Sequence, residues 1–332
     1  MNSLVDLKNA GQYSGIEYRI CEMKEKYDFD SKICVSGRFF YLTFRDKAPT
    51  EEEFAKFIYD KIIRYCIPRS KIQEAKQKFF ETGDERHITN LHDEAKNLFV
   101  KSVKERGAQL GEPGELIAFI ILEAFFNAPQ IACKMFLKTS EKMPVHGSDS
   151  VHIRMSNDGK KLELFWGEAK LYSELSTALD KALNSISEFI NGKEDSPDPR
   201  VPRDRDIDII KNHPNIESED MKFALLKYFD PYESESNYWK EIYTCMVGFD
   251  FSLYNQLKGV QEKDVEDYFR NKYIERIKSA CKLFEGKIKS CNLEELEFAF
   301  ILLPFKSLEN FRNEFYKLLG IKKEELGDCV ND

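Results

Sequence analysis

The sequence predicts an α/β (α+β) protein in which a mixed sheet is flanked by helices and preceded by an N-terminal α+β region. Two observations support this fold class. From residue 115 on, the hydrophobic patterns follow the order helix, strand, strand, helix, strand, helix, strand, helix, as expected for a sheet covered by helices. Hydrophobic residues make up 42% and aromatic residues 13% of the 332 positions, which is enough apolar material for a sizeable core.

The N-terminal region contains both strand and helix patterns. Residues 32–44 alternate in the manner of a strand, with Gly37 as an expected turn or bulge. A helix is predicted from Thr50, because Thr50 and Glu53 have the spacing of a capping box and apolar residues follow at helical intervals. More helix follows, with a break at Gly83.

We expect residues 1–104 to form this N-terminal region and residues 105–322 to form the main domain. Residues 191–206 are polar and contain prolines, which predicts a loop. The other elements expected in the main domain are a buried helix at 115–127, a two-stranded ribbon at 146–170, a helix at 173–190, a strand at 243–254, a charged helix at 261–289, a strand at 296–304, and a helix at 307–319 that ends at Gly320.

Composition restricts the possible functions. The eight cysteines are scattered without paired spacing, so we expect neither a zinc site nor a disulfide framework, and a reducing cytoplasm fits best. The longest apolar run, at 116–128, is too short to cross a bilayer, so we expect no membrane partner. The net charge of −8 disfavours strong unaided binding to nucleic acid, which depends on Lys and Arg. A nucleic-acid enzyme of this composition needs a local basic patch, a metal at the contact point, or a partner that brings the substrate.

The ribbon has a strong turn signal. Asp158-Gly159 predicts a two-residue type I′ loop, with Asn157 opposite Lys160. In this register the numbers of facing residues sum to 317, and a slip by one residue would scatter both faces. The pairs expected on the apolar face are Met155 with Leu162, Ile153 with Leu164, and Val151 with Trp166; Arg154 with Glu163 and His152 with Phe165 are expected on the other face.

Beyond the pair Val151 and Trp166, the same face of the ribbon carries charged residues. The next pair is Asp149 with Glu168, whose Cβ atoms should lie about 4.5–5.5 Å apart, and Lys170 points to the same side. Two carboxylates so close together favour a cation between them, and Mg²⁺ suits a few carboxylate oxygens and retained waters. The plainer alternative is that Asp149 caps a loop and that Glu168 and Lys170 form a surface pair.

An acidic residue followed by Glu-x-Lys at a strand end resembles the PD-(D/E)xK nuclease site. Asp149, Glu168 and Lys170 match that motif residue for residue, and Ser148 stands at the position usually held by proline. The resemblance implies a core of the restriction-endonuclease type.

Three neighbouring stretches resemble a more specific family. "GEPGE" opening an apolar helix, then "HGSD", then "FWGEAKLY" is similar to the HamA family, the nuclease subunit of the Hachiman antiphage defence system, which also resembles the AbpA proteins. This resemblance covers about residues 110–190. It implies a metal-dependent DNA endonuclease that works beside a helicase, HamB, in antiviral defence.

The resemblance also suggests roles for individual residues. Glu115 would complete the metal site with Asp149 and Glu168, and Mg²⁺ (or Mn²⁺) is the implied cofactor. Glu115 is attractive because its helix is apolar almost all round and a carboxylate is favoured in the first helical turn, although plain capping is the alternative. Lys170 would orient or deprotonate the attacking water and stabilise charge on the phosphorane, and the Ala169 carbonyl is a possible further ligand. The competing helix acids are Glu112 and Glu123.

Several residues are candidates for contacting DNA. His146 lies near the motif, and the loop at 191–206 carries Arg200, Arg203 and Arg205, although a polar or solvated loop is the plainer interpretation. The few histidines disfavour an HNH-type nuclease. No phosphate-binding motor loop is present, which points to a separate helicase partner. Two alternatives stay open: a non-catalytic adaptor with a nuclease-like fold, and an RNA-directed nuclease.

Overall fold

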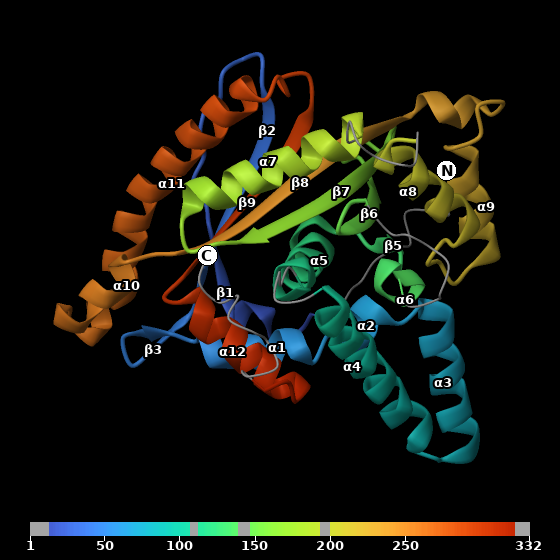
Figure 1. Ribbon diagram of the computed structural model, residues 1–332, viewed down its shortest axis with the longest axis horizontal. Coiled ribbons are helices and arrows are strands. Elements are labelled where there is room, and N and C mark those ends of the chain that lie inside the picture. Colours follow the sequence, from blue (N-terminus) through green and yellow to red (C-terminus); the bar gives the residue numbers. More distant parts are fainter. Residues whose placement is uncertain (1–12, 107–111, 139–146, 193–199, 323–332) are drawn as a thin grey trace.

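The computed structural model describes residues 13–106, 112–138, 147–192 and 200–322 (Figure 1). Seven strands form one mixed sheet in the order β1-β2-β9-β8-β7-β6-β5, and β3 pairs with β4 in a separate ribbon. The strands β2, β9, β8 and β7 run parallel, whereas β1, β6 and β5 pair antiparallel with their neighbours. The bounds are β1 (Ile20–Met23), β2 (Cys34–Leu42), β3 (Phe44–Arg45), β4 (Ala48–Pro49), β5 (Gln130–Ala132), β6 (Ser150–Met155), β7 (Leu162–Leu171), β8 (Trp239–Asp250) and β9 (Glu297–Phe305).

Helices cover both faces of this sheet, which confirms the predicted fold class. The helices α7 and α11 pack on one face, and α1, α5 and α12 pack on the other. Single turns of 3₁₀ helix occur at Ile16–Tyr18, Ser234–Asn237, Leu257–Gly259 and Glu262–Asp264. The α-helices are α1 (Glu51–Tyr59), α2 (Ile62–Cys66), α3 (Arg69–Thr82), α4 (Arg86–Arg106), α5 (Glu112–Phe126), α6 (Lys134–Lys138), α7 (Leu175–Asn191), α8 (Pro202–Asn212), α9 (Glu219–Lys227), α10 (Leu253–Gln256), α11 (Val265–Ser290) and α12 (Leu308–Leu319).

The centre of the sheet is buried on both sides. Leu164 and Trp166 of β7 belong to the core beneath α7 and α11, and Phe165 and Ala169 of the same strand belong to the core beneath α5. Parallel strands covered on both faces read as continuous apolar runs rather than as alternating patterns. No described helix is both long enough and apolar enough to cross a membrane.

The N-terminal strands belong to this same sheet, because β2 pairs with β9. The division between residues 1–104 and residues 105–322 stays a prediction. Gly37 is neither a turn nor a bulge: it lies within β2, directly opposite Phe300, in an unbroken register. A Cβ atom at Gly37 would come within 2.7 Å of the Phe39 ring, so packing explains this glycine.

The ribbon has the predicted register but a different turn. The five predicted pairs are formed, and a sixth pair that sums to 317, Ser150 with Gly167, ends the ladder. Only Gly159 has a positive φ in the turn, at 68°, so Asp158 does not adopt the second left-handed conformation that a type I′ turn needs. The Gly159 N–H donates to the Ser156 carbonyl, and the four residues 157–160 form the loop. Because two-residue and four-residue loops have the same parity, the register is unchanged.

Part of the predicted loop at 191–206 is helical instead. Helix α8 begins at Pro202, a position where proline is tolerated because the first turn has no N–H partner to lose. Arg203 and Arg205 therefore lie on a helix, and only Arg200 precedes it. The strand expected at 243–254 is β8, which starts four residues earlier and ends at Asp250.

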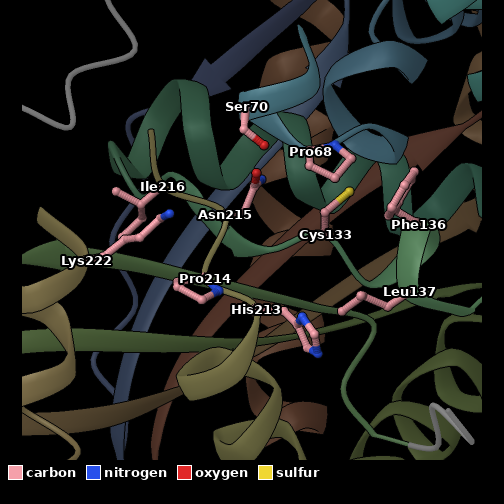
Figure 2. A pocket seen from close by; sticks show the side chains of 10 residues that line it. All are labelled: Pro68, Ser70, Cys133, Phe136, Leu137, His213, Pro214, Asn215, Ile216 and Lys222. Atoms are coloured by element: carbon pink, nitrogen blue, oxygen red, sulfur yellow. The ribbon is translucent and has the colours of Figure 1, made fainter. Parts of the chain in front are cut away.

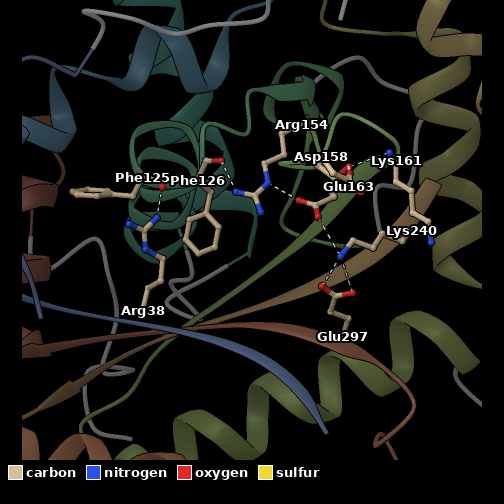
Figure 3. Close-up of polar contacts among 10 residues, drawn as sticks. Arg38, Phe125, Phe126, Arg154, Asp158, Lys161, Glu163, Lys240 and Glu297 are labelled. Atoms are coloured by element: carbon tan, nitrogen blue, oxygen red, sulfur yellow. Dashed lines mark hydrogen bonds and ion pairs between the residues drawn. The ribbon is translucent and has the colours of Figure 1, made fainter. Parts of the chain in front are cut away.

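Helix α5 is held at both ends. At its C-terminus, Arg38 donates to the Phe125 carbonyl and Arg154 donates to the Phe126 carbonyl at 2.9 Å (Figure 3). These arginines satisfy final carbonyls and oppose the negative end of the helix dipole. At the other end, a Cβ atom on Gly114 would lie 3.1 Å from Leu171 Cγ, so the first turn of α5 packs closely on the last residues of β7.

Candidate functional site

Asp149 lies at the end of the ribbon but outside its regular ladder. The Asp149 N–H donates to the Gly167 carbonyl at 2.8 Å, whereas the predicted register places Asp149 opposite Glu168. The carboxylate of Asp149 accepts a hydrogen bond from the Ala169 N–H at 2.9 Å. The regular Asp149–Glu168 pair is therefore not formed, because the chain bends at Asp149. The bend places the carboxylate against the edge of β7, beside Glu168.

Glu168 and Lys170 lie on the α7 side of β7, as expected. Glu168 is only 7% exposed, and Lys170 donates to its carboxylate. Burial, followed by the charge of Asp149, raises the pKa of Glu168 to about 8, although Lys170 and Ser185 of α7 act to lower it. Burial opposes the charged form of Lys170, but Glu168, Asp149 and Glu115 outweigh it and raise the pKa of the ammonium above its usual range.

Glu115 joins this cluster from the first turn of α5. Its side chain is 2% exposed and accepts a hydrogen bond from the Tyr65 hydroxyl at 2.7 Å. Burial, then the charge of Glu115, raises the pKa of Tyr65 well above its usual range, and the charge of Asp149 adds to the effect. Tyr65 therefore stays a hydrogen-bond donor, and Glu115 is held near Asp149 and Lys170.

A buried ion pair fixes the segment that carries Asp149. Lys134 of α6 pairs with Asp206 of α8 at 2.8 Å, and each side chain is at most 2% exposed. Asp206 also accepts from the Ser148 N–H at 3.0 Å and from the Ser148 hydroxyl at 2.8 Å, while Lys134 donates to the Ser148 carbonyl. A Cβ atom on Gly147 would lie 2.5 Å from Asp206 Oδ1, so the absence of a side chain there allows the close approach. These contacts set the position from which Asp149 reaches β7.

The competing helix acids have other surroundings. Glu123 is 1% exposed and accepts from the Tyr13 hydroxyl, from Arg69 at 3.1 Å and from the Gln130 N–H at 2.9 Å. A buried carboxylate with this many donors is compensated within the fold. The side chain of Glu112 lies outside the described residues.

The predicted DNA-contacting residues are dispersed. Arg200 pairs with Asp208 at 3.2 Å, and Arg203 lies 3.5 Å from Glu241. Arg205 is a half-buried residue of α8. His146 lies outside the described residues. A DNA-binding role for these four residues stays a prediction.

A mostly apolar cavity lies away from this cluster. A cavity of about 190 Å³ lies between the start of α3 and the segment after α8 (Figure 2). Burial raises the pKa of Cys133, which lines it, to about 12, so this thiol is a poor nucleophile. Its lining residues are Pro68, Ser70, Cys133, Phe136, Leu137, His213, Pro214, Asn215, Ile216 and Lys222. We therefore assign the candidate site to the carboxylate cluster at the end of β7, where the charges converge.

The cluster contains three carboxylates and one ammonium that act on one another: Glu115, Asp149, Glu168 and Lys170. Within the described part of the chain, no group of three His, Cys, Asp or Glu side chains is placed closely enough to hold a metal ion. Mg²⁺, however, usually takes only one or two protein carboxylates and keeps several waters. Asp149 and Glu168, which are hard oxygen donors with adjacent charges, fit that requirement as a pair. A divalent cation would offset the negative charge of this carboxylate pair.

Sequence reasoning missed the residues that support the cluster. Tyr65 is an ordinary apolar-face position of α2, and nothing in its spacing reveals its hydroxyl partner. Asp206 had a usable signal, because it precedes Ile209 and Ile210 by three and four residues and so shares their buried helix face. Lys134 stands alone among apolar residues, and a lone lysine predicts no partner.

The sequence is similar to a known protein family. The model of the HamA family matches residues 18–319, which include all four residues of the carboxylate cluster. No curated protein matches the sequence.

Proposed function

The chain belongs to the HamA family, which supports a role in Hachiman antiphage defence, and we propose that it acts there as a metal-dependent nuclease. The observation that carries this proposal is the convergence of Asp149, Glu168 and Lys170 at the end of β7, with Glu115 reaching the same place from α5. An excess of buried carboxylates beside one lysine lowers the stability of the fold. Groups that are perturbed in this way are common at sites that bind a ligand or catalyse a reaction.

Asp149 and Glu168 would hold Mg²⁺ or Mn²⁺, with Glu115 as a further carboxylate beside them. A bound divalent ion lowers the pKa of its water and polarises a phosphoryl oxygen. The Ala169 N–H holds one Asp149 oxygen at 2.9 Å, which orients the carboxylate without neutralising it. Glu168 has a pKa of about 8 in the absence of an ion, so ion binding near neutral pH would displace a proton from this carboxyl group.

Lys170 has the properties of a charge-stabilising group. Its raised pKa keeps the ammonium protonated at neutral pH, which favours stabilising the phosphorane and orienting water over removing a proton from that water. The hydrogen bond that Lys170 donates to Glu168 holds the ammonium beside the carboxylates. The side chain is 23% exposed, so it is accessible from one side.

We further propose that the substrate is DNA and that a helicase partner delivers it. The net charge of −8 supports a delivered substrate, since few phosphate contacts are expected from an acidic chain. The absence of a phosphate-binding motor loop from the sequence agrees with a separate motor protein.

The decisive test compares Lys170→Ala with Lys160→Ala, an exposed lysine in the turn of the same ribbon. We expect the purified chain, with its co-encoded partner where needed, to cleave plasmid DNA with Mg²⁺ and not with a chelator. Lys170→Ala should lose about 10²–10³-fold in cleavage rate, and Lys160→Ala should keep it.

Other outcomes reject parts of the proposal. Equal cleavage by both variants would remove Lys170 from the mechanism. If no divalent ion supports cleavage while the partner still binds, the chain is a non-catalytic adaptor. Preferential cleavage of RNA in competition would replace DNA as the substrate.

A further inference from the structure

A second cavity, of about 210 Å³, lies beside α3 and differs in charge from the rest of the molecule. Three cationic side chains and one carboxylate line it, in a chain whose net charge is −8. Its lining residues are Arg64, Arg69, Ile72, Gln73, Lys76 and Glu217. The cavity is therefore a local reversal of the overall charge.

One face of α3 provides most of the lining. Arg69, Gln73 and Lys76 are separated by four and three residues, which places them on one side of the helix. Gln73 donates to Glu217 at 3.2 Å, so the carboxylate is engaged by a neutral amide. The cations that line the cavity thus come from two helices: Arg69 and Lys76 from α3, and Arg64 from α2.

Two arginines of the cavity lining, Arg64 and Arg69, pair with one buried carboxylate. Arg69 and Arg64 lie 3.1 Å and 3.5 Å from the carboxylate oxygens of Glu123, which is 1% exposed. Each contact with Glu123 uses one terminal guanidinium nitrogen, and Arg64 also interacts with Tyr13. A guanidinium has five N–H donors in a planar fork. Glu123 therefore restricts the orientation of both guanidinium groups, which also line the cavity. This arrangement reduces the entropy lost when an anion binds.

We propose that this cavity binds a phosphate group, either free or in a nucleic-acid backbone. Arginine forks match phosphate oxygens, and Lys76 adds an exposed point charge to the lining. Phosphate binding at this position does not depend on the proposed nuclease activity.

The role of the cavity in substrate binding does rest on the proposed function. Glu123 and Glu115 are eight residues apart on α5, which corresponds to about 12 Å along the helix. A phosphate in the cavity would therefore lie near the carboxylate cluster but outside it. For a nuclease, this would be a backbone contact away from the cleaved bond.

The test measures binding in the presence of a chelator, so that metal-dependent cleavage does not contribute. The probe is a short fluorescein-labelled oligothymidylate, with inorganic phosphate and thymidine monophosphate as competitors and thymidine as the uncharged control. We expect Lys76→Gln to weaken binding about fivefold. It should also reduce the slope of log affinity against log salt by about 0.7, because one phosphate contact is lost.

Lys78→Gln is the matched control, since Lys78 is an exposed lysine of α3 that does not line the cavity. It should change neither the affinity nor the slope. Equal losses in the two variants, or no loss in Lys76→Gln, would overturn the proposal. If inorganic phosphate binds through Lys76 but the oligonucleotide does not, the ligand is a free phosphate and the backbone contact is rejected. Cleavage with Mg²⁺ is a separate measurement, so its absence would reject the nuclease and not the phosphate site.

Discussion

Strand β7 has a charged cluster near each end, and the two clusters differ in how their charges are matched. Near the start, Glu163 pairs with Arg154 and also with Lys240, at 3.1 Å, and Lys240 continues to Glu297 at 2.7 Å (Figure 3). Each carboxylate there has a cationic partner. Such a network joins β6, β7, β8 and β9 and needs nothing from outside the chain.

The carboxyl-terminal end of the same strand is organised differently. Five residues after Glu163, Glu168 shares its surroundings with Asp149 and Glu115, and Lys170 is the cation that acts on all three. Burial there raises the pKa of Glu168 to about 8, which means that the fold works against its charge. Both ends of β7 therefore hold buried charge, but at the carboxyl-terminal end three carboxylates act on one lysine.

The largest expected effect comes from removing one carboxylate charge at each end. Glu163→Gln should lower the free energy of unfolding by about 2 kcal/mol, because Arg154 and Lys240 lose a buried acceptor. Glu168→Gln should cost little stability, since a pKa of about 8 leaves Glu168 mostly protonated at neutral pH and Gln resembles the neutral acid, but it should abolish most of the proposed cleavage. Chemical unfolding and plasmid cleavage measure the two effects.

Exchanged effects would reject this difference between the two ends of β7. An unstable Glu168→Gln with full activity would make the second cluster structural. Retained stability in Glu163→Gln would show that exposure of its partners, at 27% and 32%, already weakens the first cluster.

How far the sequence predicts the fold depends on the range of the interactions. The ribbon register is local and was confirmed, since alternating residues and a short turn leave one arrangement that keeps an apolar face. The turn type was wrong, because Asp158 satisfies its carboxylate locally, with the Ser156 hydroxyl at 2.6 Å and the Lys160 N–H at 3.1 Å. An Asp-Gly pair allows both turns, and the choice between them depends on such local hydrogen bonds.

In the candidate site, too, the contacts within the ribbon were predictable and those between distant segments were not. Asp149, Glu168 and Lys170 were predicted to meet because they lie on one ribbon. Glu115 was placed there by family resemblance and by its apolar helix, and the structure brings it to the same cluster. The Lys134–Asp206 pair joins residues that are 72 positions apart, and no local pattern links them. Contacts of this kind follow from topology, which composition does not specify.

The raised pKa of Glu168 makes the stability of the protein depend on pH. Glu168 has a raised pKa of about 8 in the folded chain against an ordinary value of 4.5, so the folded state keeps a proton that the unfolded chain has already lost. The free energy of unfolding should therefore fall as pH rises from about 4.5 to about 8 when divalent ions are absent. Urea unfolding across this range, with a chelator, measures the slope. Glu168→Gln should flatten it, and an unchanged slope in that variant would assign the effect to other groups.

The smallest predicted effect concerns Tyr65, which supports the imbalanced cluster without a charge of its own. Tyr65→Phe keeps the ring and removes the 2.7 Å hydrogen bond to Glu115. Because groups that orient ligands commonly contribute to metal affinity, the affinity for Mn²⁺ measured by calorimetry should fall about tenfold. Tyr273→Phe is the matched control, since it also loses a buried hydroxyl bond, to the Phe40 carbonyl at 3.0 Å, but none to a carboxylate. It should reduce stability and leave Mn²⁺ affinity unchanged. Equal affinity in the parent chain and in Tyr65→Phe would show that Glu115 is positioned by the helix alone.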